Sequence, residues 1–315
     1  MASAKDIASA AALLRAGRLV AFPTETVYGL GADASSAPAV ARLYAVKGRP
    51  AEHPVIVHFA SASLAFHWAR SVPEAARRLA ERFWPGPLTL ILERGEKAKD
   101  FVTGGQDSVG LRVPSHPVAR QLLQAFGGAV AAPSANRFGR VSPTNAQHVR
   151  DDLGGDVDLV LEGGESEVGI ESTILDLTSG DPVLLRPGKI SAAQLEAEAK
   201  IKVGTKKPGS APRHSGGLER HYAPRTPARL VETFRLDQEI ARLGDKVAVL
   251  AFSRPDERVD FWLRMPREPH AYAQRLYGAL RELDSTGSEL ILVEAPPAEP
   301  DWAAVVDRLR RACGG

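Results

Sequence analysis

Short runs of apolar residues recur along the N-terminal two-thirds of the chain and are typical of β-strands. They predict strands at residues 18–22, 55–59, 88–92, 108–113, 128–132, 157–161 and 173–177. Between several of these runs, apolar residues return at helical spacing and predict helices at 5–16, 38–46, 73–83 and 116–126. The alternation of strands and helices favours an α/β domain built on a twisted sheet.

The character of the sequence changes between residues 200 and 228, where basic residues are interleaved with glycine and proline. This composition predicts a linker. Beyond it, apolar runs predict strands at 228–232, 246–252, 259–265 and 289–296. Helices are expected at 270–283 and at 301–313, the second with Asp301 as its N-cap. The C-terminal part therefore predicts a smaller, Rossmann-like α/β domain with a parallel sheet, although it lacks a G-x-G-x-x-G motif.

Composition narrows the class of protein without indicating a function. The chain has 315 residues, 44% hydrophobic and 25% charged, as expected of an ordinary globular protein with two domains. Its 40 basic and 38 acidic residues give a net charge of +2, which offers no argument for nucleic-acid binding. Cys313 is the single cysteine, so no disulfide can form within the chain. Because the sequence shows neither a signal peptide nor a membrane-spanning run, we expect a cytoplasmic protein.

Seven short sequence motifs, rich in glycine, proline and polar residues beside apolar runs, follow one another between residues 20 and 177. They are VAFPTETVYGLG (20–31), KGRP (47–50), HPVIVH (53–58), WPGPLTLIL (84–92), GLRVP (110–114), APSANRFGRVSPT (132–144) and GIESTILDL (169–177). In this order, they resemble the YrdC/Sua5 family of L-threonylcarbamoyladenylate synthases. The strings AYAQRLYGALRELDSTG (271–287) and AVVDRLRRA (304–312) resemble the extra C-terminal domain of the longer Sua5 branch.

The resemblance implies an enzyme that condenses L-threonine, bicarbonate and ATP to threonylcarbamoyl-AMP and pyrophosphate. This adenylate is the activated donor for the tRNA modification N6-threonylcarbamoyladenosine. The resemblance also implies a YrdC-like twisted mixed sheet with a concave groove at 1–208, a linker at 209–227 that folds over the active site, and a C-terminal domain at 228–315. We expect Mg²⁺ to arrive with ATP rather than on protein side chains. The product would pass to the tRNA threonylcarbamoyl transferase machinery, without direct tRNA binding by this chain.

Lys47 and Arg49 place a point charge and a guanidinium fork close together, and both suit phosphate oxygens. Taken alone, they could equally be a solvated pair after a helix. The resemblance places them at the triphosphate of ATP and gives them a positioning role, which they share with Ser134 and Asn136. It assigns further contacts with ATP to His53, Ser108, Ser134, Ser142, Arg186 and Tyr222.

Two of these assignments have a purely structural alternative, and one position differs from the residue usual in the family. A loop of serine, asparagine and glycine such as 134–142 is common in simple turns. Tyr222 could be a turn residue before Pro224. Phe138 stands where the family usually has a small residue, which leaves the shape of this loop open.

The resemblance assigns the L-threonine site to Thr26, His58, Arg112, Ala132 and Ser172. Arg112 lies in an apolar strand, where an unpaired charge is too costly to bury, so it must pair or face a cavity. It could form a structural salt bridge, or, as the resemblance implies, bind the carboxylate of threonine. Thr26 could instead cap local backbone, and His58 could be a packing residue at the end of a strand.

Two other classes of function fit parts of the sequence. A nucleic-acid binding module could use a basic groove for RNA, and would show strong salt dependence and no turnover. The nearly neutral charge and the absence of interleaved aromatic and basic residues argue against it. A carbamoyl-transfer domain like those in hydrogenase maturation would share the fold. Those chains carry additional acylphosphatase-like and zinc-finger segments, which this sequence lacks.

Overall fold

The computed structural model describes residues 1–179, 181–205, 212–218 and 220–314. Among them, the chain forms two compact units. The first comprises residues 1–138, 143–167 and 171–217, and the second comprises 139–142, 168–170 and 218 onwards. The predicted boundary at 208, and residues 209–211 and 219 of the predicted linker, lie outside the described residues.

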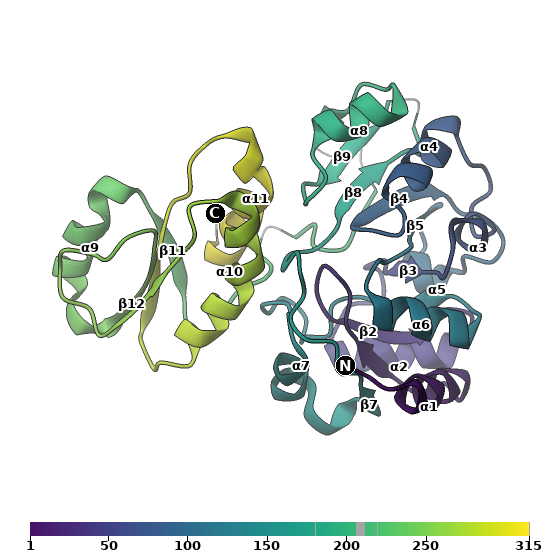
Figure 1. Ribbon diagram of the computed structural model, residues 1–315, viewed down its shortest axis with the longest axis horizontal. Helices are drawn as coiled ribbons and strands as arrows, with labels where there is room; N and C mark the ends of the chain where they lie inside the picture. The colour runs from purple at the N-terminus through teal and green to yellow at the C-terminus, as the bar shows by residue number, and fades with distance from the viewer. Residues whose placement is uncertain (180, 206–211, 219, 315) are drawn as a thin grey trace. The chain divides into compact units, whose positions relative to one another are not determined.

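The first unit is built on a large mixed sheet, which the described residues form in the order β10-β9-β8-β4-β5-β3-β6-β2-β1-β7 (Figure 1). Its strands are β1 (Val20–Phe22), β2 (Gly29–Asp33), β3 (Ile56–His58), β4 (Leu88–Glu93), β5 (Ser108–Arg112), β6 (Val130–Ala131), β7 (Leu159–Val160), β8 (Thr173–Asp176), β9 (Val183–Arg186) and β10 (Gly204–Thr205). The pairs β3–β5 and β4–β8 are parallel, whereas β1–β2 and β4–β5 are antiparallel. The predicted twisted mixed sheet is therefore confirmed.

Helices connect these strands and pack on the sheet. Within the described residues they are α1 (Ala4–Arg15), α2 (Ala37–Lys47), α3 (Ala62–Phe66), α4 (Glu74–Phe83), α5 (Asp100–Thr103), α6 (Pro117–Phe126), α7 (Ala146–Leu153) and α8 (Ala192–Ala199). The first begins with a capping box, in which Ser3 and Asp6 exchange side chain-to-backbone hydrogen bonds. It ends before Gly17, whose φ of 72° favours glycine.

The two faces of the sheet are covered differently. Because side chains alternate along a strand, Val57, Leu90 and Leu111 share one face, where they belong to the main buried core together with residues of α2 and α4. On the opposite face, α1 and α6 cover the region of β1 and β6 through a second apolar cluster. Farther along that second face lies a small apolar cluster made of Ile56, Ile91, Ile174 and Leu185. The candidate site lies on this second face.

The second unit contains a parallel sheet in the order β11-β14-β12-β13. Its elements are β11 (Ala228–Val231), α9 (Leu236–Leu243), β12 (Val247–Ala251), β13 (Phe261–Arg264), α10 (Pro269–Asp284), β14 (Leu290–Glu294) and α11 (Ala303–Cys313). Short 3₁₀ turns of this unit lie at Thr233–Arg235, Gly244–Lys246 and Pro300–Trp302, and the first unit has one at Gly154–Asp156. The predicted smaller α/β domain with a parallel sheet is confirmed.

One predicted helix start is wrong. Asp301 was expected to cap the last helix, but it lies inside the 3₁₀ turn Pro300–Trp302, and α11 begins after Trp302. Trp302 already has helical backbone angles, so the chain enters α11 without the extended residue that a side-chain cap requires.

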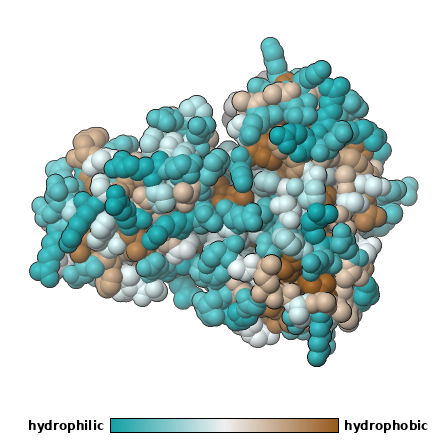
Figure 2. All heavy atoms as spheres, viewed as in Figure 1, coloured by the Kyte–Doolittle hydropathy of each residue, from teal (hydrophilic) through white to brown (hydrophobic). Residues whose placement is uncertain are grey.

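Hydrophilic side chains cover much of the face seen in Figure 2, with smaller hydrophobic areas between them. Among the described residues, none of the helices combines the length and apolar character needed to cross a membrane.

Candidate active site

Thr24 fixes the turn that follows β1. Its Oγ1 accepts hydrogen bonds from the backbone N–H groups of Thr26 and Val27, both at 3.2 Å, and its carbonyl oxygen accepts one from the Ser166 hydroxyl at 3.0 Å. The side chain that caps the local backbone of this turn is therefore that of Thr24. The Thr26 hydroxyl lies 2.8 Å from that of Thr24. Glu25 is held between these two threonines.

Arg112, the last residue of β5, is buried and forms an ion pair with Glu25. Its Nη2 lies 2.7 Å from Oε1 of Glu25, and the two side chains are 5% and 3% exposed. Oε2 of Glu25 accepts a hydrogen bond from the backbone N–H of Ser115 at 3.0 Å. The salt-bridge interpretation of Arg112 is thus correct for one end of the guanidinium, while its contact with a substrate carboxylate stays a prediction.

His58, the last residue of β3, lies directly opposite Arg112 in the parallel β3–β5 pair. Burial, and secondly the charge of Arg112, lower the pKa of His58 well below its usual 6.5. The imidazole is therefore neutral near neutral pH. Its buried Nδ1 has no hydrogen-bond partner among the described residues. A buried ring nitrogen of this kind can exchange a hydrogen bond with a ligand.

On the other side of Arg112 stands Thr89 of β4, because Leu90 pairs with Leu111 in the antiparallel β4–β5 ladder. The Thr89 hydroxyl lies 2.8 Å from that of Ser172, which precedes β8. Three neighbouring strands therefore place a histidine, an arginine and a threonine side by side on one face of the sheet.

Arg186, at the end of β9, connects Ser172 with the predicted linker. Its Nε donates to the carbonyl oxygen of Ser172 at 2.9 Å, and its Nη2 donates to the Ser172 hydroxyl at 3.1 Å. Its Nη1 donates to the carbonyl oxygen of Ser215 at 3.0 Å. The hydroxyl of Ser215 lies 3.4 Å from Nη2 of Arg49. A residue expected to bind threonine and two expected to bind ATP thus belong to one hydrogen-bonded network of the first unit.

Lys47, the last residue of α2, is buried, so the interpretation of Lys47 and Arg49 as a solvated pair is wrong. Its Nζ donates to the carbonyl oxygens of Ser134 and Asn136, the latter at 2.6 Å. Burial, and secondly the charge of Arg49, lower the pKa of Lys47 well below its usual value. The amino group of Lys47 therefore holds the 134–136 loop from inside the fold through its two hydrogen bonds.

Arg49 is also buried and packs against Phe138. Its Nη2 donates to the carbonyl oxygen of Pro54 at 2.8 Å, and its guanidinium carbon lies 5.5 Å from the centre of the Phe138 ring. The half-buried His53 meets the same ring edge-on at 5.4 Å. Burial, and secondly Arg49, lower the pKa of His53. The phenyl ring thus fills the space between two residues that were expected to contact ATP.

Two further predicted residues lie on the strands of this region. Ser108 opens β5 and is buried. Ala132 directly follows β6, and its N–H donates to the carbonyl oxygen of Ile56 at 3.1 Å. The loop after it is attached by a bridge between Ser134 and Gly29. Both predicted residues are therefore fixed by the sheet rather than by a mobile loop.

Ser142 and Tyr222 belong to the second unit. Tyr222 is buried, has a φ of 60°, and packs under the guanidinium of Arg308 at 5.5 Å and beside the ring of Tyr277 at 5.8 Å. Ser142 is buried as well. Tyr222 is thus part of a packed cluster rather than a simple turn residue, and the contacts of both residues with ATP stay predictions.

Part of the predicted linker lies against the first unit. Arg213 and Gln106 exchange two hydrogen bonds, at 2.6 and 3.0 Å, and the guanidinium of Arg213 donates to the carbonyl oxygen of Gly104 at 2.8 Å. Ser215 also donates its hydroxyl to the carbonyl oxygen of Pro54 at 3.1 Å. Residues 212–217 therefore contact the same unit that carries Arg49 and Arg186.

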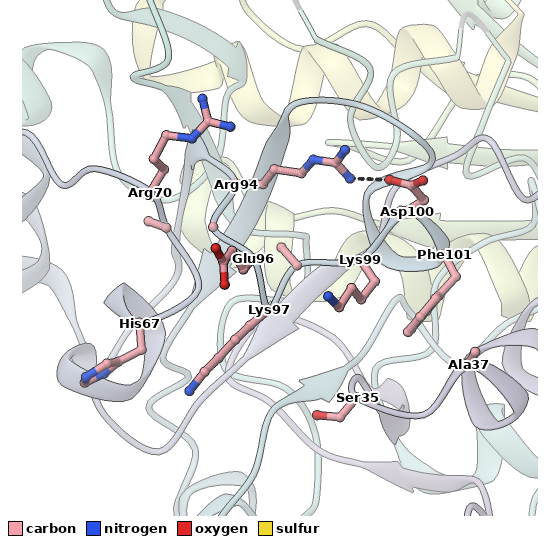
Figure 3. A pocket seen from close by; sticks show the side chains of 13 residues that line it. Ser35, Ala37, His67, Arg70, Arg94, Glu96, Lys97, Lys99, Asp100 and Phe101 are labelled. Carbon is pink, nitrogen blue, oxygen red and sulfur yellow. Dashed lines mark hydrogen bonds and ion pairs between the residues drawn. The ribbon is translucent and has the colours of Figure 1, made fainter.

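A cavity of about 1040 Å³ in the first unit contains none of these residues (Figure 3). Segment 94–101 supplies much of its lining, and there Arg94 forms an ion pair with Asp100. Lys97 and Lys99 are exposed. Substrate sites usually combine enclosure with a few convergent polar groups, and the buried network around Arg112 and Arg186 fits that description better.

A resident metal ion has no evident protein ligands in this region. Across the part of the chain that the structure describes, no three His, Cys, Asp or Glu side chains lie close enough together to hold one. Mg²⁺ commonly keeps several waters and binds substrate phosphates, so the donor set fits a metal that enters with a nucleotide.

The chain is similar in sequence to two known family models. Residues 12–188 match the family model Sua5_yciO_yrdC, described as "Telomere recombination", and residues 190–314 match a model described as the C-terminal domain of threonylcarbamoyl-AMP synthase. The chain belongs to the Sua5/YciO/YrdC family. A Sua5/YciO/YrdC protein with both segments is what the sequence resemblance predicted.

Two relatives and one solved structure match nearly the whole chain. A threonylcarbamoyl-AMP synthase of Pyrococcus abyssi is 41% identical over 318 residues, which cover 97% of this chain and 93% of the relative. The Bacillus subtilis threonylcarbamoyl-AMP synthase is 40% identical over 323 residues, covering 98% and 93%. The crystal structure of P. abyssi Sua5 complexed with L-threonine matches with a TM-score of 0.91 and 39% identity, over 98% of this chain and 94% of that one.

Three residues of the network were not foreseen from the sequence: Glu25, Thr89 and Ser215. Glu25 carried a usable signal, because a buried arginine in an apolar strand needs a counter-ion, and an acidic residue within the PTET turn could supply it. Thr89 and Ser215 carried no such signal, since their contacts depend on strand pairing and on the path of the linker.

Proposed function

We propose that this protein is an enzyme that forms threonylcarbamoyl-AMP and pyrophosphate from L-threonine, bicarbonate and ATP. The observation that carries the proposal is the buried network in which Ser172 joins the neighbourhood of Arg112 to Arg186 and Arg49. Such a network can hold an amino acid at one end and a polyphosphate at the other. The names of the relatives, both threonylcarbamoyl-AMP synthases, support the same activity.

In the proposed complex, Thr26, His58, Arg112, Ala132 and Ser172 bind L-threonine. The guanidinium of Arg112 meets the α-carboxylate, since charge-assisted pairing of a guanidinium with a carboxylate is strong and directional. The neutral His58 beside it contributes a hydrogen bond and no further charge. The complex of P. abyssi Sua5 with L-threonine supports an amino-acid site in this fold.

The nucleotide is proposed to bind Lys47, Arg49, His53, Ser108, Ser134, Ser142, Arg186 and Tyr222, with Asn136 helping to position the loop. The reaction then needs no nucleophile from the protein. The amino group of threonine adds to the carbon of bicarbonate with loss of water and a proton, and an oxygen of the resulting carbamate attacks the α-phosphorus. Pyrophosphate leaves from the opposite side, and the cations neutralise the charge that it carries away.

Mg²⁺ would be carried by ATP, and the adenylate would pass to the tRNA threonylcarbamoyl transferase machinery in the cytoplasm. Residues 1–208 would be the catalytic domain, 209–227 a linker that folds over the active site, and 228–315 the C-terminal domain.

The test is an omission experiment with the purified full-length chain, ATP and Mg²⁺. We expect pyrophosphate release only when L-threonine and bicarbonate are both present, and carbon from labelled bicarbonate should appear in the adenylate. Release without bicarbonate would indicate an aminoacyl-adenylate synthetase instead, and release without threonine would indicate a simple ATPase.

A further inference from the structure

Arg112 depends on Glu25 for its counter-charge. The guanidinium is buried in an apolar strand, where a lone charge would be strongly destabilising. Arg112 Nη2 donates to Oε1 of Glu25 at 2.7 Å, and no other ion pair is made by Arg112 within the described residues. Removing the carboxylate would therefore leave the guanidinium charge uncompensated inside the fold.

Glu25 is itself fixed at both ends. Its second oxygen accepts the N–H of Ser115 at 3.0 Å, so both carboxylate oxygens have a partner. Its backbone lies in the turn that Thr24 closes with hydrogen bonds to Thr26 and Val27. A carboxylate held in this way can orient the group that it binds, because it has little freedom to follow that group.

One nitrogen of the Arg112 guanidinium, Nη1, is available for a ligand. Nη2 binds Glu25, and Nε lies 3.4 Å from the carbonyl oxygen of Gly86. Nη1 makes no hydrogen bond with any described residue, and this atom is not fully buried. Its two N–H groups can therefore receive a ligand without displacement of Glu25.

We propose that Glu25 is a positioning residue of the amino-acid site, which holds Arg112 so that Nη1 meets the α-carboxylate of the substrate. This inference rests on the proposed function. It makes Glu25 a determinant of specificity for a ligand with a free carboxylate, although Glu25 itself does not contact that carboxylate. The alternative role, in which Glu25 competes with the substrate for Arg112, predicts the opposite sign for its removal.

The main experiment compares full-length wild type with Glu25→Gln, which keeps the size of the side chain and removes its charge. Calorimetric titrations use L-threonine and L-threoninol, the latter lacking the carboxylate. We expect Glu25→Gln to weaken binding of L-threonine by about 10–100-fold, since charge-assisted contacts dominate such pairing. Binding of L-threoninol, and the KM for ATP, should change less than about twofold, because neither is proposed to use Nη1.

A double-mutant comparison separates action through Arg112 from a general effect on the fold. In an Arg112→Ala background, adding Glu25→Gln should change threonine affinity by less than about twofold. Thr24→Val provides a second variant that leaves both charges in place and removes the hydrogen bonds of the Thr24 hydroxyl within the turn, including its contact with the Thr26 hydroxyl. It should reduce threonine affinity a few-fold with threoninol unaffected, and it decides the question if Glu25→Gln does not fold.

Each outcome has a distinct meaning. Equal or tighter threonine binding by Glu25→Gln overturns the inference in favour of competition. Parallel loss of threonine and threoninol overturns it in favour of a purely structural role. If the folded wild type binds no threonine at all, the proposed function fails together with the inference, whereas a normal wild type with an unaffected variant overturns the inference alone.

Discussion

The phenyl ring of Phe138 lies 5.5 Å from the guanidinium carbon of Arg49, and the ring of His53 meets it from another side. A guanidinium over an aromatic face is attracted by the ring and is also restricted in its orientation. The phenyl ring in the 132–144 loop therefore packs against two residues of the proposed nucleotide site. The ring limits the orientations that the Arg49 guanidinium can adopt.

Replacing Phe138 with alanine should weaken the binding of ATP. The contact is worth about 0.5–2 kcal/mol when partly desolvated, which corresponds to a rise of roughly 2–30-fold in the KM for ATP. Threonine affinity, measured by calorimetry, should stay unchanged because Arg49 and His53, against which the Phe138 ring packs, belong to the proposed nucleotide site. Phe138→Tyr keeps the aromatic face and serves as the matched control, with ATP kinetics close to wild type.

Lys47→Met should lower kcat/KM for ATP by more than about tenfold. The amino group donates to the carbonyl oxygens of Ser134 and Asn136, and leaving a buried acceptor without its donor costs about 1–3 kcal/mol. The matched control is Lys97→Met, which alters an exposed lysine of the cavity in Figure 3. Steady-state pyrophosphate release should be normal in the control. A strong loss in Lys97→Met would instead place a substrate in that cavity.

His58 should make the protein less stable as the pH falls. Because the folded pKa lies well below 6.5, the unfolded chain takes up a proton on this residue before the folded chain does. Stability linked to His58 is therefore present above about pH 6.5 and is lost progressively below it. Urea unfolding at about pH 7.5 and 5.5 should show a smaller pH-dependent loss for His58→Gln than for wild type. An equal loss in both would mean that His58 is protonated in the folded state.

Gly31→Ala should destabilise the first unit by about 1–3 kcal/mol, because overpacking forces neighbours to move. A Cβ at this position of β2 would lie 2.9 Å from the Phe22 ring and 3.1 Å from the carbonyl oxygen of Val20. Thermal and urea unfolding of the full chain measure the effect.

Gly278→Ala is the matched control for this substitution. Gly278 lies within α10, and a Cβ there would meet nothing within 4 Å. Alanine is the better helix former, so this variant should gain about 0.5–1 kcal/mol in the second unit. A destabilised Gly278→Ala, or an unchanged Gly31→Ala, would contradict the packing described for these helices and strands.

Local sequence patterns correctly predicted the helices and strands whose residues strongly favour that secondary structure. The apolar runs at 88–92 and 246–252 form β4 and β12, and the stripe of Tyr272, Leu276, Leu280 and Leu283 is buried in α10. By contrast, β2 was not foreseen, because its sequence GLGAD has no β-branched or aromatic residue. It is a strand because β1 and β6 pair with it from both sides.

The site shows the same division between local and long-range information. The family motifs predicted candidate residues of the site. Three of them, Arg112, His58 and Ser172, lie in one region of the first unit. The order of the strands, which places Thr89 and His58 on either side of Arg112, depends on pairing between distant segments. The contacts of Glu25 with Arg112 and of Ser215 with Arg186 join residues 87 and 29 positions apart, so their geometry depends on the fold, although the buried position of Arg112 indicated the need for a counter-ion.

Part of the buried network around the proposed amino-acid site projects from hydrogen-bonded strands. His58, Arg112 and Thr89 each stand on backbone that the neighbouring strands hold in register. A change of side chain at one of these positions alters the shape or charge of the pocket while the main chain stays in place. For protein engineering, this makes the sheet a stable platform on which acceptance of other amino acids could be explored one substitution at a time.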